Sequence, residues 1–137
     1  MRALGIDLGG KRIGVAISDN DGKVATPLQV LKRSKNTKED HKKISDLVSE
    51  WEAECVVVGM PYSLNGDKGP AAKAVEEEVE ELASAVSVPV DIHDERLTTV
   101  IAAQELSLQG LDNKRQRKVI DQVAASVILQ SWLDNRT

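Results

Sequence analysis

The sequence predicts an α/β domain built on a mixed sheet. Residues 1–33 alternate apolar side chains with small or polar ones, at the period of two expected for strands. From residue 36 onward, stretches with apolar residues three and four positions apart alternate with two short apolar strands. Strand–helix–strand crossovers imply parallel pairing, with helices packed on the sheet. The predicted sheet is therefore antiparallel at its front end and parallel behind.

The front end is predicted to be a meander of three strands. Alternation over residues 3–8 and again over 12–19 marks the first two strands. Residues 20–22, Asn-Asp-Gly, predict a tight turn into a third strand at about 23–31, because these residues tolerate positive φ. Pro27 cannot donate to a ladder, so the third strand is expected at the sheet edge.

A helix and a central strand follow the meander. Asn36 with Glu39 three residues later is typical of a helix start. An apolar stripe then repeats at helical spacing: Ile44, Leu47, Val48 and Trp51. The run at 55–60 is continuously apolar, which predicts a strand buried on both faces.

The rest of the chain predicts a loop, three helices and one more strand. After a loop at 61–69, Pro70 suits the first turn of a helix whose glutamates face water. The inward residues of this helix are expected to be Ala72, Val75, Val79, Leu82, Ala83 and Val86. A strand is predicted at 88–93, followed by helices at about 98–108 and 115–133.

Composition limits the class of protein. The 137 residues, 41% hydrophobic and 29% charged, predict one domain spanning 1–137. The single cysteine, Cys55, excludes a disulfide framework and fits a buried apolar role in a reducing, cytoplasmic setting. No apolar run approaches the roughly 20 residues of a membrane helix. His41 is expected on the surface of a charged helix, and His93 is expected to be structural.

The net charge of −4 hides a segregation of charges. Segment 32–43 holds six basic residues against two acidic ones. A second run is purely basic: Lys114, Arg115, Arg117 and Lys118. These runs are either solvated helix faces or a basic face for nucleic acid, and the sequence leaves both open.

Three carboxylates occupy positions that call for a partner. Asp7 interrupts an apolar strand, where burial of an unpaired charge costs several kcal/mol. Asp121 shares a helical stripe with residues expected to face the sheet, and Glu95 follows the last strand, at the end where α/β sheets gather sites. Carboxylates that converge there would repel one another unless Mg²⁺ or a similar ion lay between them. For each residue, an ordinary strand-end, solvent-facing or ion-paired role is the alternative.

Four stretches together resemble the YqgF/RuvX family of Holliday-junction-resolvase-like proteins. They are MRALGIDLGGKRIGVAISD, VVVGMPYSLNGDKG, DERLTT and KVIDQVAASVILQSWL, in that order. The resemblance implies a ribonuclease H-like fold with a five-stranded mixed sheet and helices on both faces. It also implies a metal-dependent endonuclease that matures the 5′ end of pre-16S rRNA in the bacterial cytoplasm.

The resemblance also assigns residues. It implies that Asp7, Glu95 and Asp121 hold one or two Mg²⁺ or Mn²⁺ ions, and that Lys11 and Arg12 lie near substrate phosphate. True junction resolvases of related type carry a further acid in the fourth strand and another late in the last helix. Here residues 56–61 hold no acid and the position three past Asp121 is alanine.

The expected reaction is hydrolysis of a phosphodiester by water attacking in line, with the basic segments, including the run at 114–118, positioning the strand. The expected partner is structured precursor rRNA, with branched DNA and a pre-ribosomal particle as further candidates, in a monomer or homodimer. A non-catalytic nucleic-acid-binding or ribosome assembly factor is the main alternative. The segment GIDLGG also resembles the first phosphate-binding loop of sugar kinases and actin-like ATPases. Those enzymes would need a second domain.

Overall fold

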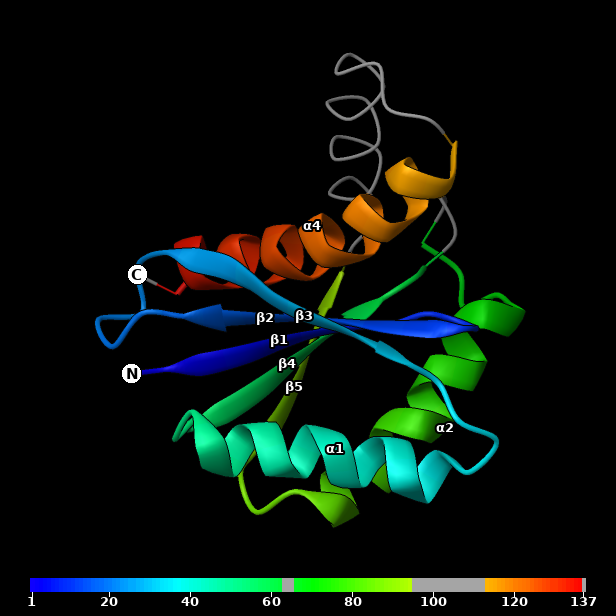
Figure 1. The fold of residues 1–137 in the computed structure, drawn as a ribbon, viewed down its shortest axis with the longest axis horizontal. Coiled ribbons are helices and arrows are strands. Elements are labelled where there is room, and N and C mark those ends of the chain that lie inside the picture. The colour runs from blue at the N-terminus through cyan, green and yellow to red at the C-terminus, as the bar shows by residue number, and fades with distance from the viewer. Residues whose placement is uncertain (63–65, 95–112, 137) are drawn as a thin grey trace.

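The computed structural model describes residues 1–62, 66–94 and 113–136, and only the backbone of 113–122. A five-stranded sheet with helices on both faces is its framework (Figure 1). The elements, in chain order, are β1 (Ala3–Leu8), β2 (Arg12–Ser18), β3 (Ala25–Lys32), α1 (Thr37–Glu50), β4 (Cys55–Met60), α2 (Pro70–Ala85), β5 (Val90–Asp94) and α4 (Asn113–Asp134).

The strand order is β3-β2-β1-β4-β5. The pairs β1–β2 and β2–β3 are antiparallel, and β1–β4 and β4–β5 are parallel. This is the mixed sheet that the sequence predicts. Pro27 lies in β3, which is an edge strand as expected. A bulge in the β2–β3 pairing lies beside it, between Val15 and Ala16.

The helices form two layers around the sheet, with α1 and α2 on one face and α4 on the other (Figure 1). Each layer has its own apolar core. Leu4, Ile6 and Val58 belong to the cluster under α1 and α2, while Ala3 and Val57 join Ala125, Ile128 and Leu129 under α4. Successive residues of β1 and β4 thus face opposite layers, which explains why β4 is apolar throughout.

The differences from the predicted elements are small. The last strand begins at Val90 rather than 88, and the final helix begins at Asn113 rather than 115. Ala83 is exposed on α2, so its predicted inward position is wrong, whereas Ala72, Val75, Val79 and Leu82 are buried. The helix predicted at 98–108 lies outside the described residues. Within the described ranges, no helix is both long and apolar enough to cross a bilayer.

Candidate functional site

Asp7 lies near the carboxyl end of β1, the central strand of the sheet, and is half-buried. Leu4 and Ile6 point into the core under α1 and α2, and Ala3 points to the α4 side. Alternation therefore places the side chain of Asp7 on the α4 face, together with Gly5. The carboxyl ends of β1, β4 and β5 meet at this edge, because these three strands are parallel.

Gly5 allows α4 to lie directly against β1. A Cβ atom added at Gly5 would stand 2.7 Å from the Cβ of Leu129 and 3.0 Å from the carbonyl oxygen of Ala125. Any larger residue would push the helix away from the strand. Gly5, which lies on the same face as Asp7, thus sets the distance between α4 and β1.

The direction of α4 determines where Asp121 belongs. Ala125 and Leu129 lie over Gly5, while Leu133 reaches the β2–β3 turn at Gly22, beside Met1. The helix therefore runs antiparallel to β1 (Figure 1). Asp121 precedes Ala125 by just over one turn, or about 6 Å along the helix axis. The backbone of Asp121 is therefore displaced from Ala125 toward the carboxyl end of β1, and Asp7 is displaced from Gly5 in the same direction.

Several predicted site residues lie wholly or partly outside the described structure. Glu95 directly follows the last residue of β5 but is not described. Asp121 and the basic run Lys114, Arg115, Arg117 and Lys118 lie in α4, and only their backbone is described. Convergence of the three carboxylates therefore stays a prediction, and Asp7 is the one of the three whose side chain lies within the described structure.

Two basic residues share the α4 face with Asp7. Asp7 is paired with Gly14 of β2, so Arg12, two residues away, is its diagonal neighbour on the same face. Arg12 is paired in turn with Lys32 of β3. In the sequence, Lys32 is one member of the basic segment 32–43, but the register of β3 places it on the same face as Asp7 and Arg12.

The bulge in β3 is what brings Lys32 to this face. Near the turn, Ala16 pairs with Pro27, but Val15 pairs with Gln29. One extra residue on β3 shifts every later pair, and without it Leu31 would oppose Arg12.

The turn from β1 to β2 is tightly bonded. The Gly9 amide donates to the carbonyl oxygens of Asp7 at 3.2 Å and Arg12 at 3.0 Å. A Cβ at Gly9 would lie 2.6 Å from the Arg12 carbonyl oxygen, so this position requires glycine. Lys11, at the tip, is exposed, and its carbonyl oxygen accepts from the Arg33 amide at 3.0 Å. The two basic residues of the predicted phosphate contact therefore sit on a well-defined loop.

A partly buried ion cluster lies on the opposite side of this turn. The Arg33 guanidinium donates to both carboxylate oxygens of Glu78, at 2.8 and 2.9 Å. His41 Nε2 lies 2.9 Å from Glu78 Oε2. Burial opposes ionisation of Glu78, but the hydrogen bonds from Arg33 and His41 outweigh it, so the pKa of the Glu78 carboxyl is lowered.

The surface position predicted for His41 is wrong, because its side chain is buried. His41 precedes Ile44 by three residues and Val48 by seven, so it continues the apolar stripe of α1. Glu78 likewise follows Val75 by three residues on the inner face of α2. The spacing of both residues from buried apolar positions indicates the inner face of each helix. Their charged neighbours, however, suggest a solvent-exposed position.

His93 has the structural role predicted for it. Its Nε2 lies 2.8 Å from Ser131 Oγ of α4. Two residues earlier on the same strand face, Asp91 accepts a hydrogen bond from Trp132 Nε1 at 2.8 Å. These bonds fasten the edge strand β5 to the carboxyl-terminal half of α4.

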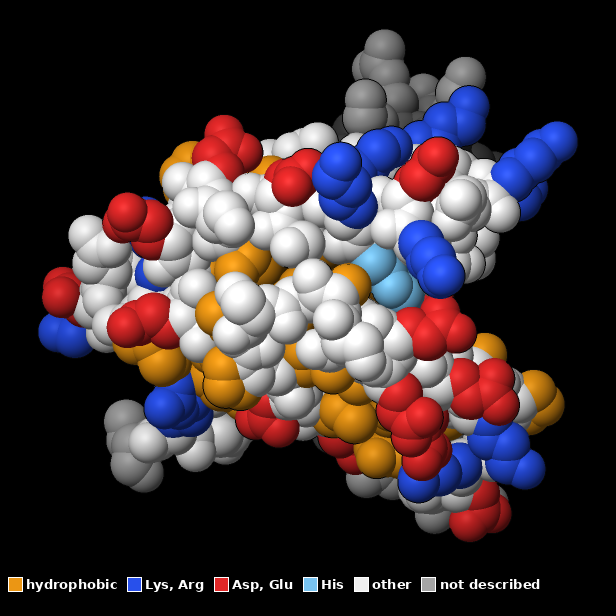
Figure 2. Space-filling view, turned by 90° about the horizontal axis from the view of Figure 1, so that it is seen from below, with side chains coloured by type: hydrophobic (Ala, Val, Ile, Leu, Met, Phe, Trp, Pro, Cys, Tyr) orange, Lys and Arg blue, Asp and Glu red, His pale blue; other side chains and the backbone are white. Residues whose placement is uncertain are grey.

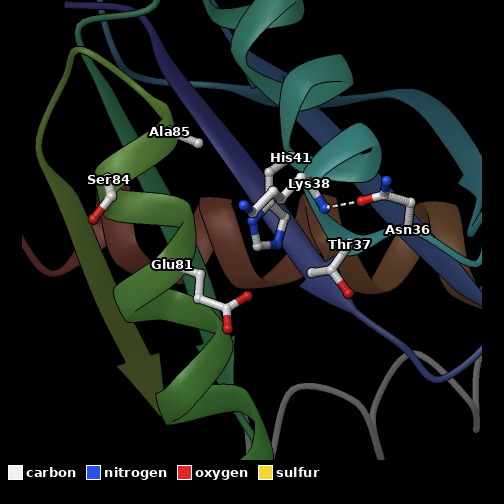
Figure 3. A pocket seen from close by; sticks show the side chains of 7 residues that line it. All are labelled: Asn36, Thr37, Lys38, His41, Glu81, Ser84 and Ala85. Atoms are coloured by element: carbon white, nitrogen blue, oxygen red, sulfur yellow. Dashed lines mark hydrogen bonds between the residues drawn. The ribbon is translucent and has the colours of Figure 1, made fainter.

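Two cavities flank the ion cluster. One, of about 530 Å³, lies between the β1–β2 turn and the start of α2; its lining includes Asp7, Gly9, Gly10, Arg33, Pro61 and Glu78. The other, of about 690 Å³, lies between α1 and α2, and Figure 3 shows His41 and Glu81 reaching into it. On this side of the molecule, Lys and Arg side chains are interspersed with Asp and Glu (Figure 2).

The carboxylate of Asp7, on the α4 face of the sheet, suits a hard divalent cation. Mg²⁺ and Mn²⁺ prefer carboxylate oxygens and need few of them from a protein. In the described part of the chain, no three His, Cys, Asp or Glu residues are grouped to hold a metal ion, and two of the three predicted ligands fall outside it.

Comparison with known proteins identifies the family. The family model described as "Holliday junction resolvase", RuvX, matches residues 1–135. The chain belongs to the RuvX family. A Rhodococcus opacus relative is 47% identical over 99% of this chain and 79% of its own length. A Thermoanaerobacter pseudethanolicus relative is 44% identical over 99% and 98%. Both relatives carry the name "Putative pre-16S rRNA nuclease".

Solved structures confirm the ribonuclease H-like fold. RuvC of Thermus thermophilus superimposes with a TM-score of 0.57 at 19% identity, over 99% of this chain and 96% of RuvC. The strand order of this RuvX chain is the one predicted for that fold. At this level of identity the likeness concerns the fold alone. In this RuvX chain, Val56, Val57 and Val58 of β4 are fully buried, and β4 supplies no carboxylate.

Proposed function

We propose that this RuvX chain is a metal-dependent endonuclease that hydrolyses phosphodiester bonds in structured precursor rRNA, at the 5′ end of pre-16S rRNA. The observation that carries the proposal is the position of Asp7. Its carboxylate lies at the carboxyl end of the central strand, on the face that α4 crosses and that Arg12 and Lys32 share. The names of the RuvX relatives supply the substrate.

In this proposal, Asp7, Glu95 and Asp121 hold Mg²⁺ or Mn²⁺. The antiparallel course of α4 supports the inclusion of Asp121, and the end of β5 at Asp94 supports that of Glu95. When bound, a divalent ion activates the attacking water and neutralises charge that develops on the phosphate. The residues of the chain orient the scissile phosphate and keep it against the carboxylates.

Basic residues hold the nucleic acid on both sides of the carboxylates. Lys11 and Arg12 approach from the β1–β2 turn. The run Lys114, Arg115, Arg117 and Lys118 belongs to the first turns of α4, beyond Asp121 in the direction away from Ala125. The chain has three aromatic residues, Trp51, Tyr62 and Trp132, and all three pack beside the core, so phosphate contacts and duplex shape govern recognition. Processing of this kind belongs to the bacterial cytoplasm.

A cleavage assay tests the proposal. Purified protein is incubated with end-labelled precursor rRNA or a four-way DNA junction, each with Mg²⁺, Mn²⁺ or a chelator. The proposal predicts cut RNA that depends on the divalent ion. Cleavage of the junction alone would favour a resolvase, and chelator-insensitive binding without product would favour an assembly factor; either result contradicts the proposal.

A further inference from the structure

We propose that Arg33 is a positioning residue, held by Glu78 and His41 so that it fixes the turn between Asp7 and Arg12. The turn carries the two basic residues expected to meet phosphate, and it directly follows the predicted metal ligand. The inference rests on the proposed function for its effect on catalysis. Its effect on the turn can be measured without any activity.

The bonds of Arg33 converge on that turn from two directions. Its Nε donates to the Gly9 carbonyl oxygen at 2.6 Å, and its backbone amide donates to the Lys11 carbonyl oxygen at 3.0 Å. One residue therefore binds the main chain of the turn on either side of Gly10. Because Gly9 also bonds to Asp7 and Arg12, displacement of Arg33 would loosen all of the turn's main-chain bonds together.

Arg33 is in turn held by both helices on its face of the sheet. Glu78 of α2 pairs with it through two parallel hydrogen bonds, a geometry that fixes the plane of a guanidinium. The Glu78 oxygen that receives Arg33 Nη1 also lies 2.9 Å from His41 Nε2 of α1. The side chains of Arg33 and Glu78 are only 15% and 17% exposed, so solvent competes weakly for these bonds.

A cavity beside the turn makes this support necessary. The 530 Å³ cavity lies between the turn and α2, so apolar packing does not brace the turn from that side. Arg33 and Glu78 line the cavity and span from α2 to the Gly9 carbonyl group. An ordinary surface ion pair such as Lys68–Glu76, with side chains 50% and 43% exposed, has no comparable role.

Two variants and one matched control test the inference. Arg33→Lys keeps the charge but lacks the planar fork that reaches Glu78 and Gly9 at once. Glu78→Gln keeps the shape but loses the carboxylate. Glu76→Gln makes the same change on the same helix at the exposed pair. Amide hydrogen exchange at Gly9 and Arg33 is measured for each protein, with the amides of β4 as an internal reference.

We expect exchange at Gly9 and Arg33 to rise roughly tenfold in Arg33→Lys and Glu78→Gln and to stay unchanged in Glu76→Gln. The kcat for RNA cleavage should fall about tenfold in the first two, with KM within about twofold, because a displaced turn misaligns the reacting groups. Unchanged exchange at the turn would overturn the inference. So would an equal rise across β4, or a locally loosened turn with unaltered kcat.

The outcomes separate this inference from the proposed function. If the wild-type protein cleaves no RNA, the proposed function fails, and the exchange rates alone decide whether Arg33 positions the turn. If the wild-type protein cleaves RNA and the exchange rates do not respond to Arg33→Lys or Glu78→Gln, the proposed function stands and the role of Arg33 is refuted.

Discussion

Gly5 of β1 and Leu129 of α4 are in such close contact that a single added carbon atom at Gly5 would lie 2.7 Å from the Leu129 Cβ. This contact fixes the helix that carries Asp121 against the strand that carries Asp7. It is the structural basis for expecting the two carboxylates at one site.

Gly5→Ala should destabilise the protein by about 1–3 kcal/mol, because the added methyl group meets both a side chain and a backbone oxygen. Urea unfolding measures the change. Gly10→Ala serves as the control, since a Cβ there meets nothing within 4 Å. Equal stability of the two variants would show that α4 does not press on β1 as described.

Asp7→Asn should reduce RNA cleavage at least about 100-fold and leave the melting temperature close to that of the wild-type protein. The amide keeps the size of the carboxylate but removes the charge that a divalent ion needs. Asp21→Asn, in the exposed turn between β2 and β3, controls for the loss of one negative charge. Full cleavage by Asp7→Asn in Mg²⁺ would refute the assignment of Asp7.

Changing all four residues of the basic run at 114–118 to glutamine should flatten the dependence of RNA affinity on salt. Each phosphate contact contributes about 0.7–0.9 to the slope of log K against log salt, so the slope should fall by up to about 3. The control changes four exposed basic residues outside both basic segments instead: Lys23, Lys68, Lys73 and Arg136. Similar slopes for both variants would place the nucleic acid elsewhere.

Ser34→Ala should weaken the fold in a pH-dependent way. Asp40 is buried, which opposes its ionisation, but hydrogen bonds from the Ser34 amide at 2.9 Å and hydroxyl at 2.8 Å outweigh this and lower its pKa. A lowered pKa stabilises the folded state above the ordinary value of about 3.9 and loses that effect as the pH falls through the lowered value.

The wild-type protein should therefore exceed Ser34→Ala in free energy of unfolding by about 1–2 kcal/mol at neutral pH. The gap should narrow as the pH is taken below about 4. Urea unfolding at several pH values gives the measurement. Ser84→Ala, which removes an exposed hydroxyl bonded to the Glu80 carbonyl oxygen, should show a small and pH-independent change. A constant gap for Ser34→Ala would mean that its hydroxyl does not stabilise the Asp40 carboxylate.

The strands could be predicted because the residue pattern of each one reflects the layers that it packs against. Residues 3–8 alternate large and small side chains because α4 lies directly against β1 at Gly5, and residues 55–60 are apolar throughout because both faces of β4 are covered. Pro27 correctly indicated the edge. Ala83 was misplaced because small apolar residues are compatible with either side of a helix.

The candidate site was less predictable. Asp7 could be identified locally, as an acid within an apolar strand. The partnership of Arg33 with Glu78 joins residues 45 positions apart, and no spacing rule links a strand end to the second helix. The position of Lys32 depends on a one-residue bulge that no turn motif in the sequence indicates. His41 was hidden because its neighbours on α1 are charged.

The most direct test of the central claim is a crystal structure of the full chain grown with Mn²⁺, with an anomalous-difference map calculated at the manganese edge. We expect an anomalous peak at about 2.0–2.3 Å from carboxylate oxygens of Asp7, Glu95 and Asp121 together. Carboxylates on separate surfaces, or a map without a peak beside Asp7, would contradict the account.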